Sequence, residues 1–137
     1  MQGSYVLVIK LFENCKIEIG SIGVVNFEKG WYAYVGSGLN YLDKRIQRHL
    51  RDEKNLHWHI DYFLSKGEIE EVLYGEGEKR KECDIANLLA EDFSVIEGFG
   101  SSDCKCEGHL FYSEDISKLR NKITSSFRTV GLKPERW

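Results

Sequence analysis

The first half of the chain consists of short apolar runs separated by turn residues, which predicts several strands before any long helix. Ser4–Leu11 is apolar at almost every position, as in a strand covered on both faces. Lys16–Gly20 alternates apolar and polar residues, which predicts a hairpin with the first strand. Gly23–Phe27 and Trp31–Val35 predict two more strands, with a turn at residues 28–30 between them.

After Gly38 the apolar residues recur at helical spacing. Leu42, Ile46 and Leu50 predict an amphipathic helix over residues 40–53, with this apolar stripe facing the sheet. A second helix is expected over Glu82–Ala90. A closing helix is expected after Ser113, its candidate N-cap, and carries the apolar positions Ile116, Leu119, Ile123 and Phe127.

Three further segments have the composition of strands: Trp58–Leu64, Glu70–Tyr74 and Phe93–Ile96. The Gly- and Ser-rich stretch Gly98–Asp103 is expected to be a loop. Together these elements predict an α+β fold with a small mixed, mostly antiparallel sheet flanked by helices. With 137 residues the chain is expected to form a single domain, residues 1–137.

Composition narrows the class of protein. Hydrophobic residues make up 42% and charged residues 30%, which is typical of a globular domain and excludes a disordered or fibrous chain. The apolar runs are too short to cross a bilayer, and the N-terminus does not resemble a signal peptide, so we expect no membrane association. The four cysteines lack the spacing of a disulfide framework. Reduced thiols and a cytoplasmic location are therefore expected.

Charge is unevenly distributed along the chain. The net charge is −3, but residues 44–51 carry +4 and residues 118–137 carry +5, so the rest of the chain carries −12. The first of these segments places Lys44, Arg45, Arg48 and Arg51 on one predicted helix. The overall negative charge alone would argue against a nucleic-acid partner. The local concentration of positive charge makes such a partner possible again.

Several motifs in order suggest a family. Tyr5 follows Gly3-Ser4 on the first strand, Tyr34 precedes Val35-Gly36 on a later one, and a helix with arginine follows. These residues are similar to the two tyrosine motifs of the GIY-YIG nuclease superfamily. More narrowly, the chain resembles the DUF123 family in five blocks that span residues 3–112: GSYVLVI, YAYVGSG, RIQRHL, HWHID and GFGSSDCKCEGHL.

The resemblance implies a GIY-YIG nuclease-like fold and metal-dependent hydrolysis of DNA phosphodiester bonds. Matched by motif, Tyr5 and Tyr34 would be the active-site tyrosines, with either one activating the water. Arg45 would stabilise the phosphate and His49 would occupy the polar position one turn later. Glu82 would hold Mg²⁺ or Mn²⁺. Members of the family also occur attached to an endonuclease III-type enzyme, which implies a role in DNA repair and a repair enzyme as partner.

The residue types suit this chemistry. A tyrosine is a poor base unless a neighbouring cation favours its phenolate, an arginine binds two phosphate oxygens at once, and a single carboxylate suits Mg²⁺. Each residue also has a plain structural interpretation. Tyr5 and Tyr34 suit a core, Arg45 a solvated helix face, and Glu82 a helix N-terminus.

Three features depart from the superfamily pattern. Ser4 replaces the isoleucine of the first motif. Tyr5 and Tyr34 are also farther apart than usual, so we expect the Lys16–Phe27 insertion to loop out as extra strands. The asparagine found late in many members has no clear equivalent, and Ser102 or Asp103 is the closest guess.

A second group of residues has the chemistry of zinc ligands. His57, His59 and Asp61 alternate, so on a strand they would share one face, and Asp103, Cys104, Cys106 and His109 follow later. We weigh three interpretations: a zinc site with ligands among Cys104, Cys106, His109, His57 and His59, a polar network that fixes the loop at 98–106, or ordinary surface. Cys15 and Cys83 are expected to be ordinary thiols.

Two functions therefore remain open. One is a metal-dependent endonuclease acting on structured or damaged DNA. The alternative is a non-catalytic nucleic-acid-binding module associated with a repair enzyme. In both, the expected DNA-binding residues are Lys44, Arg45, Arg48 and Arg51. A zinc-stabilised protein-interaction domain is a third interpretation.

Overall fold

Strand β1 (Gly3–Leu11) lies at the centre of the computed structural model, which describes residues 1–38, 40–101 and 104–137. It pairs on one side with β4 (Gly30–Gly38) and on the other with β5 (Glu68–Glu76), both antiparallel. The complete sheet has the order β6-β7-β4-β1-β5-β8, with β6 at Ser94–Val95, β7 at Leu110–Ser113 and β8 at Glu135–Arg136. The antiparallel α+β architecture expected from the sequence is confirmed.

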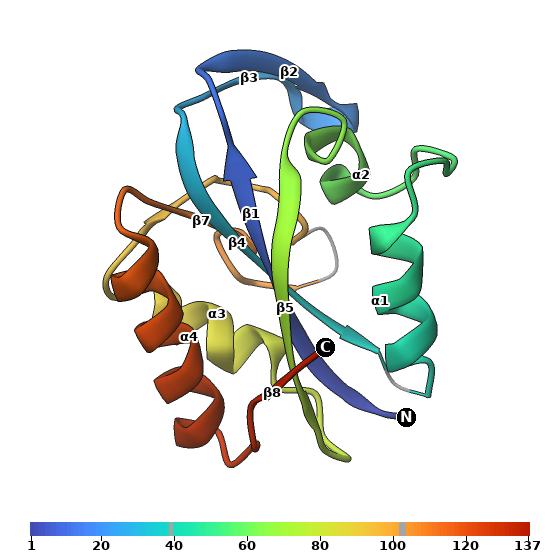
Figure 1. Ribbon diagram of the computed structural model, residues 1–137, viewed down its shortest axis with the longest axis vertical. Coiled ribbons are helices and arrows are strands. Elements are labelled where there is room, and N and C mark those ends of the chain that lie inside the picture. The colour runs from blue at the N-terminus through green and yellow to red at the C-terminus, as the bar shows by residue number, and fades with distance from the viewer. Residues whose placement is uncertain (39, 102–103) are drawn as a thin grey trace.

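Helices cover both faces of this sheet (Figure 1). One face packs on α3 (Glu82–Ala90) and α4 (Ile116–Thr129), through a core that includes Val6 and Val8 of β1. The other face packs on α1 (Leu42–Leu50) and α2 (His59–Phe63), through Tyr5, Leu7 and Ile9. Because successive side chains of β1 enter different cores, almost every position of this strand has to be apolar.

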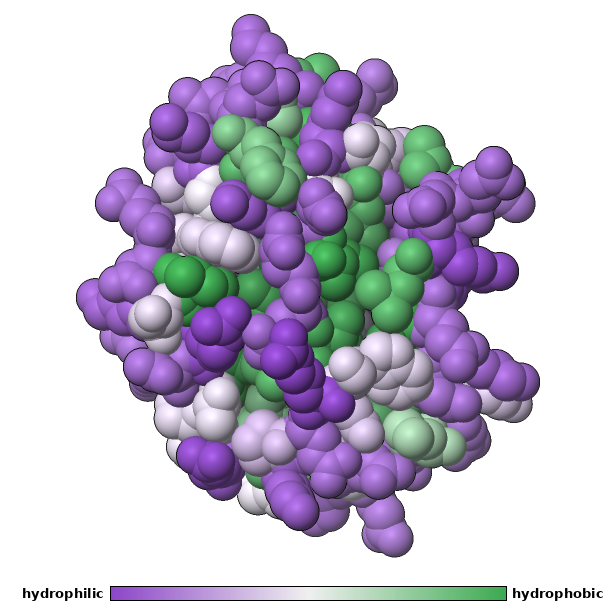
Figure 2. Space-filling model, in the orientation of Figure 1, coloured by the Kyte–Doolittle hydropathy of each residue, from purple (hydrophilic) through white to green (hydrophobic). Residues whose placement is uncertain are grey.

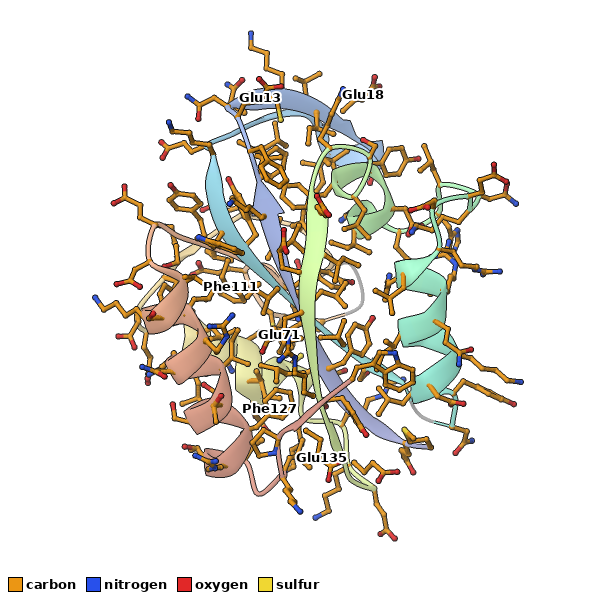
Figure 3. All side chains as sticks on the ribbon, viewed as in Figure 1. Glu13, Glu18, Glu71, Phe111, Phe127 and Glu135 are labelled. Carbon is orange, nitrogen blue, oxygen red and sulfur yellow. The ribbon has the colours of Figure 1, made fainter. Side chains whose placement is uncertain are left out.

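The phenyl rings of the α4 core lie where this helix meets the sheet. Phe111 of β7 and Phe127 of α4 are both fully buried, and Figure 3 shows both on the α4 side of the sheet. Figure 2 shows apolar residues gathered in the middle of the visible face, with hydrophilic residues around them. In the part of the chain that the structure describes, no helix is both long and apolar enough to cross a membrane.

The hairpin predicted between the first two strands is wrong. Among the described residues, strand β2 (Cys15–Ile19) pairs with β3 (Gly23–Phe27) and with no other strand, and a 3-10 turn at Gly20–Ile22 connects the two. β1 cannot accept β2, because β4 and β5 already occupy both of its edges along its length. The Lys16–Phe27 insertion therefore forms extra strands outside the main sheet, as expected, and β1 and β4 become neighbours.

The β1–β4 register sets the two tyrosines side by side. Tyr5 lies opposite Gly36, and Leu7 lies opposite Tyr34, so both tyrosine rings are on the α1 face. A β-carbon at Gly36 would collide with the ring of Tyr5. Glycine is required at this position, because only a residue without a side chain lets the phenol lie flat across β4.

Three local predictions need correction. Leu50 is 43% exposed, and His49 instead continues the buried stripe of Leu42 and Ile46. Trp58–Leu64, expected to be a strand, contains the helix α2. Ser113 ends β7, and the N-cap of α4 is Asp115, whose carboxylate accepts the backbone N–H of Lys118 at 3.1 Å.

Candidate active site and cysteine–histidine cluster

Four segments that are distant in the sequence meet at one open pocket of about 700 Å³. Its lining includes Tyr5 from β1, Tyr34 from β4, Arg45 from α1 and Glu82 from α3. The sequence analysis selected these same four residues from their motifs, and the structure brings them together. Arg80 and Asp84 add further charge to the same pocket.

Tyr5, which lines the pocket, forms a buried pair with His49, which does not line it. The Tyr5 hydroxyl lies 2.6 Å from His49 Nε2, and the two side chains are almost completely buried. Burial holds the pKa of Tyr5 well above its ordinary value of 10.0, and it lowers the pKa of His49 to about 3. Both shifts favour the neutral forms at pH 7, and one hydrogen bond joins the phenol and the imidazole.

His49 Nδ1 is also buried and has no hydrogen-bond partner among residues 1–38, 40–101 and 104–137. A buried polar atom without a hydrogen bond destabilises the folded state, so the burial of His49 lowers the stability of the protein. The same burial holds His49 Nε2 against the Tyr5 hydroxyl and so fixes the position of that hydroxyl.

Tyr34 packs beside this pair. Its ring centroid lies 6.5 Å from that of Tyr5 and 6.1 Å from that of His49. Phe99 packs edge-on against Tyr34, also at 6.1 Å between centroids. Tyr34 keeps 8% of its surface exposed, compared with 2% for Tyr5, so it is the more accessible phenol in the pocket.

Arg45 lines the pocket and is exposed to solvent, and one nitrogen of its guanidinium is already held by a hydrogen bond. Its Nη1 donates to the Ser37 carbonyl at 2.8 Å, and its guanidinium lies over the Trp58 ring, 4.9 Å from the centroid. These contacts orient the guanidinium and leave further N–H groups of this exposed residue available to an anion.

Arg48 has a different role from Arg45. Its two terminal nitrogens each donate to one oxygen of Asp61 at 2.9 Å, and its guanidinium also lies over Trp58, at 4.4 Å. Asp61 is buried and accepts two more hydrogen bonds, from the backbone N–H groups of His57 and Trp58. The ion pair therefore ties α1 to the start of α2.

The same contacts explain why the strand predicted around Asp61 does not form. A carboxylate in the first turn that accepts the N–H groups preceding the helix is a helix-start signal, and it overrides the alternating pattern of His57, His59 and Asp61. The three side chains therefore do not share a strand face.

Lys44 and Arg51 are the remaining members of the predicted DNA-binding set. Both are exposed on α1 or at its C-terminal cap, and neither lines the pocket. Arg80, which the sequence analysis did not select, also lines the pocket. Its position follows from the tertiary fold, and the loop sequence alone carries no signal for it.

Glu82 is the first residue of α3, as the pattern predicted. Its Oε2 is buried and has no hydrogen-bond partner in the described part of the chain. A buried carboxylate oxygen that accepts no hydrogen bond is expected to bind a cation or a hydrogen-bond donor from a ligand. Its place at the pocket wall fits the single carboxylate ligand that Mg²⁺ commonly takes.

A cluster of three cysteines and one histidine lies next to Glu82. Cys83, Cys104, Cys106 and His109 each offer one ligand atom, and these atoms lie within 4.8 Å of one another. This group can hold a metal ion, and its sulfur and nitrogen ligands suit zinc better than Mg²⁺ or Mn²⁺. Burial and the neighbouring thiols raise the pKa of Cys83.

The membership of the cluster differs from the sequence prediction. Cys83, expected to be an ordinary thiol, belongs to it, whereas His57 and His59 do not. His59 instead accepts the backbone N–H of Gly100 at 2.8 Å, so it fixes the 98–106 loop as the polar-network interpretation expected. Ser102 and Asp103, the guesses for the late asparagine, lie outside the described residues.

Comparison with models of protein families assigns the chain to a family. The model of DUF123, a domain of unknown function, matches residues 4–132. The chain belongs to the DUF123 family. No curated protein and no solved structure shows significant similarity to this DUF123 domain. The pocket and the cysteine–histidine cluster both lie inside the matched residues, so both are features of the DUF123 domain itself.

Proposed function

We propose that this DUF123 domain is a metal-dependent endonuclease of the GIY-YIG type that hydrolyses DNA phosphodiester bonds, in the context of DNA repair. The observation that supports the proposal is the meeting of Tyr5, Tyr34, Arg45 and Glu82 at one pocket. Two phenols, a guanidinium and a carboxylate are the groups that deprotonation of water, binding of phosphate and binding of a divalent cation require.

Arg45 binds the scissile phosphate in this proposal. The contact with Ser37 fixes the direction of the guanidinium before the substrate arrives, so little entropy is lost on binding. Arg80 lines the same pocket and adds positive charge. Stabilisation of the charge that develops on the phosphate oxygens is the larger part of catalysis in phosphoryl chemistry.

Tyr34 is the proposed base, and Tyr5 is its hydrogen-bonding partner. Burial keeps the pKa of Tyr5 high, and His49 holds its hydroxyl, so Tyr5 is suited to hold a fixed hydrogen bond and poorly suited to lose its proton. Tyr34 is more accessible from the pocket. His49 keeps the Tyr5 hydroxyl in place.

Glu82 would hold the divalent cation, as its unpartnered buried oxygen suggests. When bound, Mg²⁺ or Mn²⁺ would lower the pKa of a coordinated water and neutralise charge on the phosphate. Glu82 lies at the N-terminus of α3, and the carboxylate also compensates the positive end of the helix dipole.

The first test is cleavage of a panel of branched, nicked, single-stranded and duplex oligonucleotides with Mg²⁺ or Mn²⁺ added or omitted. We expect internal cleavage that depends on the added cation. Glu82→Gln should abolish it without loss of fold, whereas Glu78→Gln, a change at a nearby exposed position outside the pocket, should not. Equal cleavage by wild type and Glu82→Gln would remove Glu82 from the mechanism.

A second set of variants separates the remaining roles. Arg45→Ala should lower the cleavage rate by about 10²–10³-fold, as for other groups that stabilise developing charge. Tyr34→Phe should lower it further than Tyr5→Phe, measured as single-turnover rates across a range of pH. If Tyr5→Phe had the larger effect and removed the basic limb of the pH profile, the two roles would be reversed.

The alternative function is a non-catalytic DNA-binding module that accompanies a repair enzyme. The limited access to both phenols favours it, because Tyr5 is 2% exposed with a raised pKa and Tyr34, the proposed base, is itself only 8% exposed. In this case the oligonucleotide panel would show binding without cleavage under every metal condition. Arg45→Ala would then weaken binding, and Glu82→Gln would leave it unchanged.

A further inference from the structure

The cysteine–histidine cluster combines residues from two separate parts of the chain. Cys83 is the second residue of α3, whereas Cys104, Cys106 and His109 lie in the segment that leads into β7. His109 Nε2 lies 3.4 Å from the sulfur of Cys104 and 3.9 Å from that of Cys83. In a tetrahedral zinc site with bonds of about 2.0–2.3 Å, neighbouring ligand atoms are roughly 3.5–3.8 Å apart. The two observed distances lie on either side of this range, and all four ligand atoms lie within 4.8 Å of one another, so small side-chain movements would close the cluster around one ion.

The orientation of His109 is fixed from the opposite side of its ring. His109 Nδ1 lies 3.0 Å from the backbone carbonyl of Val35 on β4, and the ring is buried. A carbonyl only accepts, so Nδ1 must carry the proton and donate it. The lone pair of Nε2 then faces the three thiols. Histidines that bind metal characteristically donate their second ring N–H to a carbonyl or a carboxylate.

We propose that Cys83, Cys104, Cys106 and His109 bind one zinc ion, and that this ion fixes residues 98–101 and 104–109 as a wall of the Tyr5–Glu82 pocket. Three thiols lose their protons to the solvent on binding, and the neutral imidazole contributes its lone pair. Four protein ligands complete a tetrahedral shell. This zinc ion is therefore structural, and distinct from the divalent cation proposed at Glu82.

The 98–109 segment connects the cluster to the pocket. Phe99 packs against Tyr34, and Gly100 donates its backbone N–H to His59, while Gly100, Cys104 and His109 also line the pocket. Backbone hydrogen bonds already join the two described parts of the segment, from the Gly98 N–H to the Glu107 carbonyl and from the His109 N–H to the Phe99 carbonyl. A metal ion at the cluster would in addition cross-link these residues to α3 through Cys83.

The direct test is the metal content of the reduced protein, purified without chelator and measured by elemental analysis. We expect one zinc ion per chain. Cys83→Ser and Cys104→Ser should lose zinc, whereas Cys15→Ser should retain it, since Cys15 lies on β2 and outside the cluster. Cys106→His preserves a zinc ligand and should retain binding, which separates loss of a ligand from loss of fold.

Cobalt provides a spectroscopic readout that is independent of nuclease activity. Replacement of zinc by Co²⁺ should give thiolate-to-cobalt charge-transfer bands and the intense d–d absorption of tetrahedral cobalt in wild type and Cys15→Ser, but not in Cys83→Ser. Reduced protein that contains no stoichiometric zinc and gives no such bands would overturn the proposal. So would a disulfide between two of the cluster cysteines in freshly purified protein, detected by mass spectrometry. Failure of the oligonucleotide test leaves these readouts unaffected.

Discussion

At the scale of single residues, the Tyr5–His49 pair shows how burial changes ordinary side-chain chemistry. An exposed histidine titrates near pH 6.5, but burial, with the positive charges of Lys54, Arg48 and Arg45, lowers the pKa of His49 to about 3. The opposing effect of Asp61 is smaller than that of burial, although it is larger than that of any one of these three positive charges. His49 is thus a fixed neutral partner of Tyr5 and does not respond to physiological changes of pH.

This shift predicts a specific dependence of stability on pH. Because the unfolded chain binds a proton at His49 near pH 6.5 and the folded chain does so only near pH 3, acid favours unfolding throughout that range. As the pH is lowered from about 6.5 to about 3, His49 alone should reduce the free energy of unfolding by up to about 1.4 kcal/mol per pH unit. The difference between wild type and His49→Gln in urea unfolding at several pH values isolates the effect. An NMR signal of His49 that titrates at its ordinary pKa would contradict it.

At the scale of elements, the position of Arg45 depends on how α1 is held against α2. Arg48 and Asp61 make a two-bond ion pair between the helices, and both Arg45 and Arg48 pack on Trp58. Burial alone would raise the pKa of Asp61, but the hydrogen bonds from Arg48, Trp58 and His57 outweigh it and lower the pKa below 3.8. The charged carboxylate is therefore the form that stabilises the fold.

Asp61→Asn should destabilise the protein by about 2–3 kcal/mol, somewhat less than a fully buried pair because Arg48 is partly exposed. The lowered pKa means that the stabilisation by Asp61 is complete above about pH 4 and is lost as the pH falls through the pKa of the folded state. Urea unfolding at pH 7 and at pH 3 measures both effects, with Asp52→Asn, an exposed position nearby, as the control. Equal stability of Asp61→Asn and wild type at pH 7 would show that the ion pair contributes nothing.

At the scale of the whole molecule, positive charge is found on α1 and α4, which lie on opposite faces of the sheet. The pocket is lined by Arg45 of α1 and by the start of α3, but by no residue of α4. A nucleic acid bound at the pocket would therefore meet Lys44, Arg45 and Arg51, while the basic residues of α4 would face away from it. The two basic segments, similar in composition, are expected to differ in function.

Salt dependence tests this difference. Each phosphate contact on duplex DNA contributes about 0.9 to the slope of log affinity against log salt. Replacing Lys44 and Arg51 together by serine should flatten the slope by roughly two units. The matched double change of Lys118 and Arg128 on α4 should leave it unchanged. Binding that is insensitive to salt and to the α1 changes would exclude a nucleic-acid partner at this face.

The parts of the structure that were predictable from sequence are those that local pattern determines. The apolar run of β1 and the helical spacing in α1, α3 and α4 follow directly from burial of one or two faces. Short strands such as β7 and β8 contain too few residues for a pattern to be recognised. Asp61 starts a helix through hydrogen bonds to backbone N–H groups, which the alternating sequence pattern around it does not reveal. Cys83 and Arg80 reach the site only through the tertiary fold, which their neighbours in the sequence do not specify.

The two-residue strands at the ends of the sheet also affect how this protein meets other copies of itself. A sheet edge presents unpaired N–H and C=O groups that can template the addition of a foreign strand, which is a route to aggregation. Here β6 covers only part of β7, and β8 pairs with Leu73 and Tyr74 of β5. The uncovered part of β5 carries the exposed carboxylates of Glu68 and Glu70. A docking strand would therefore find either a very short edge or two exposed negative charges, and self-association through the sheet is disfavoured.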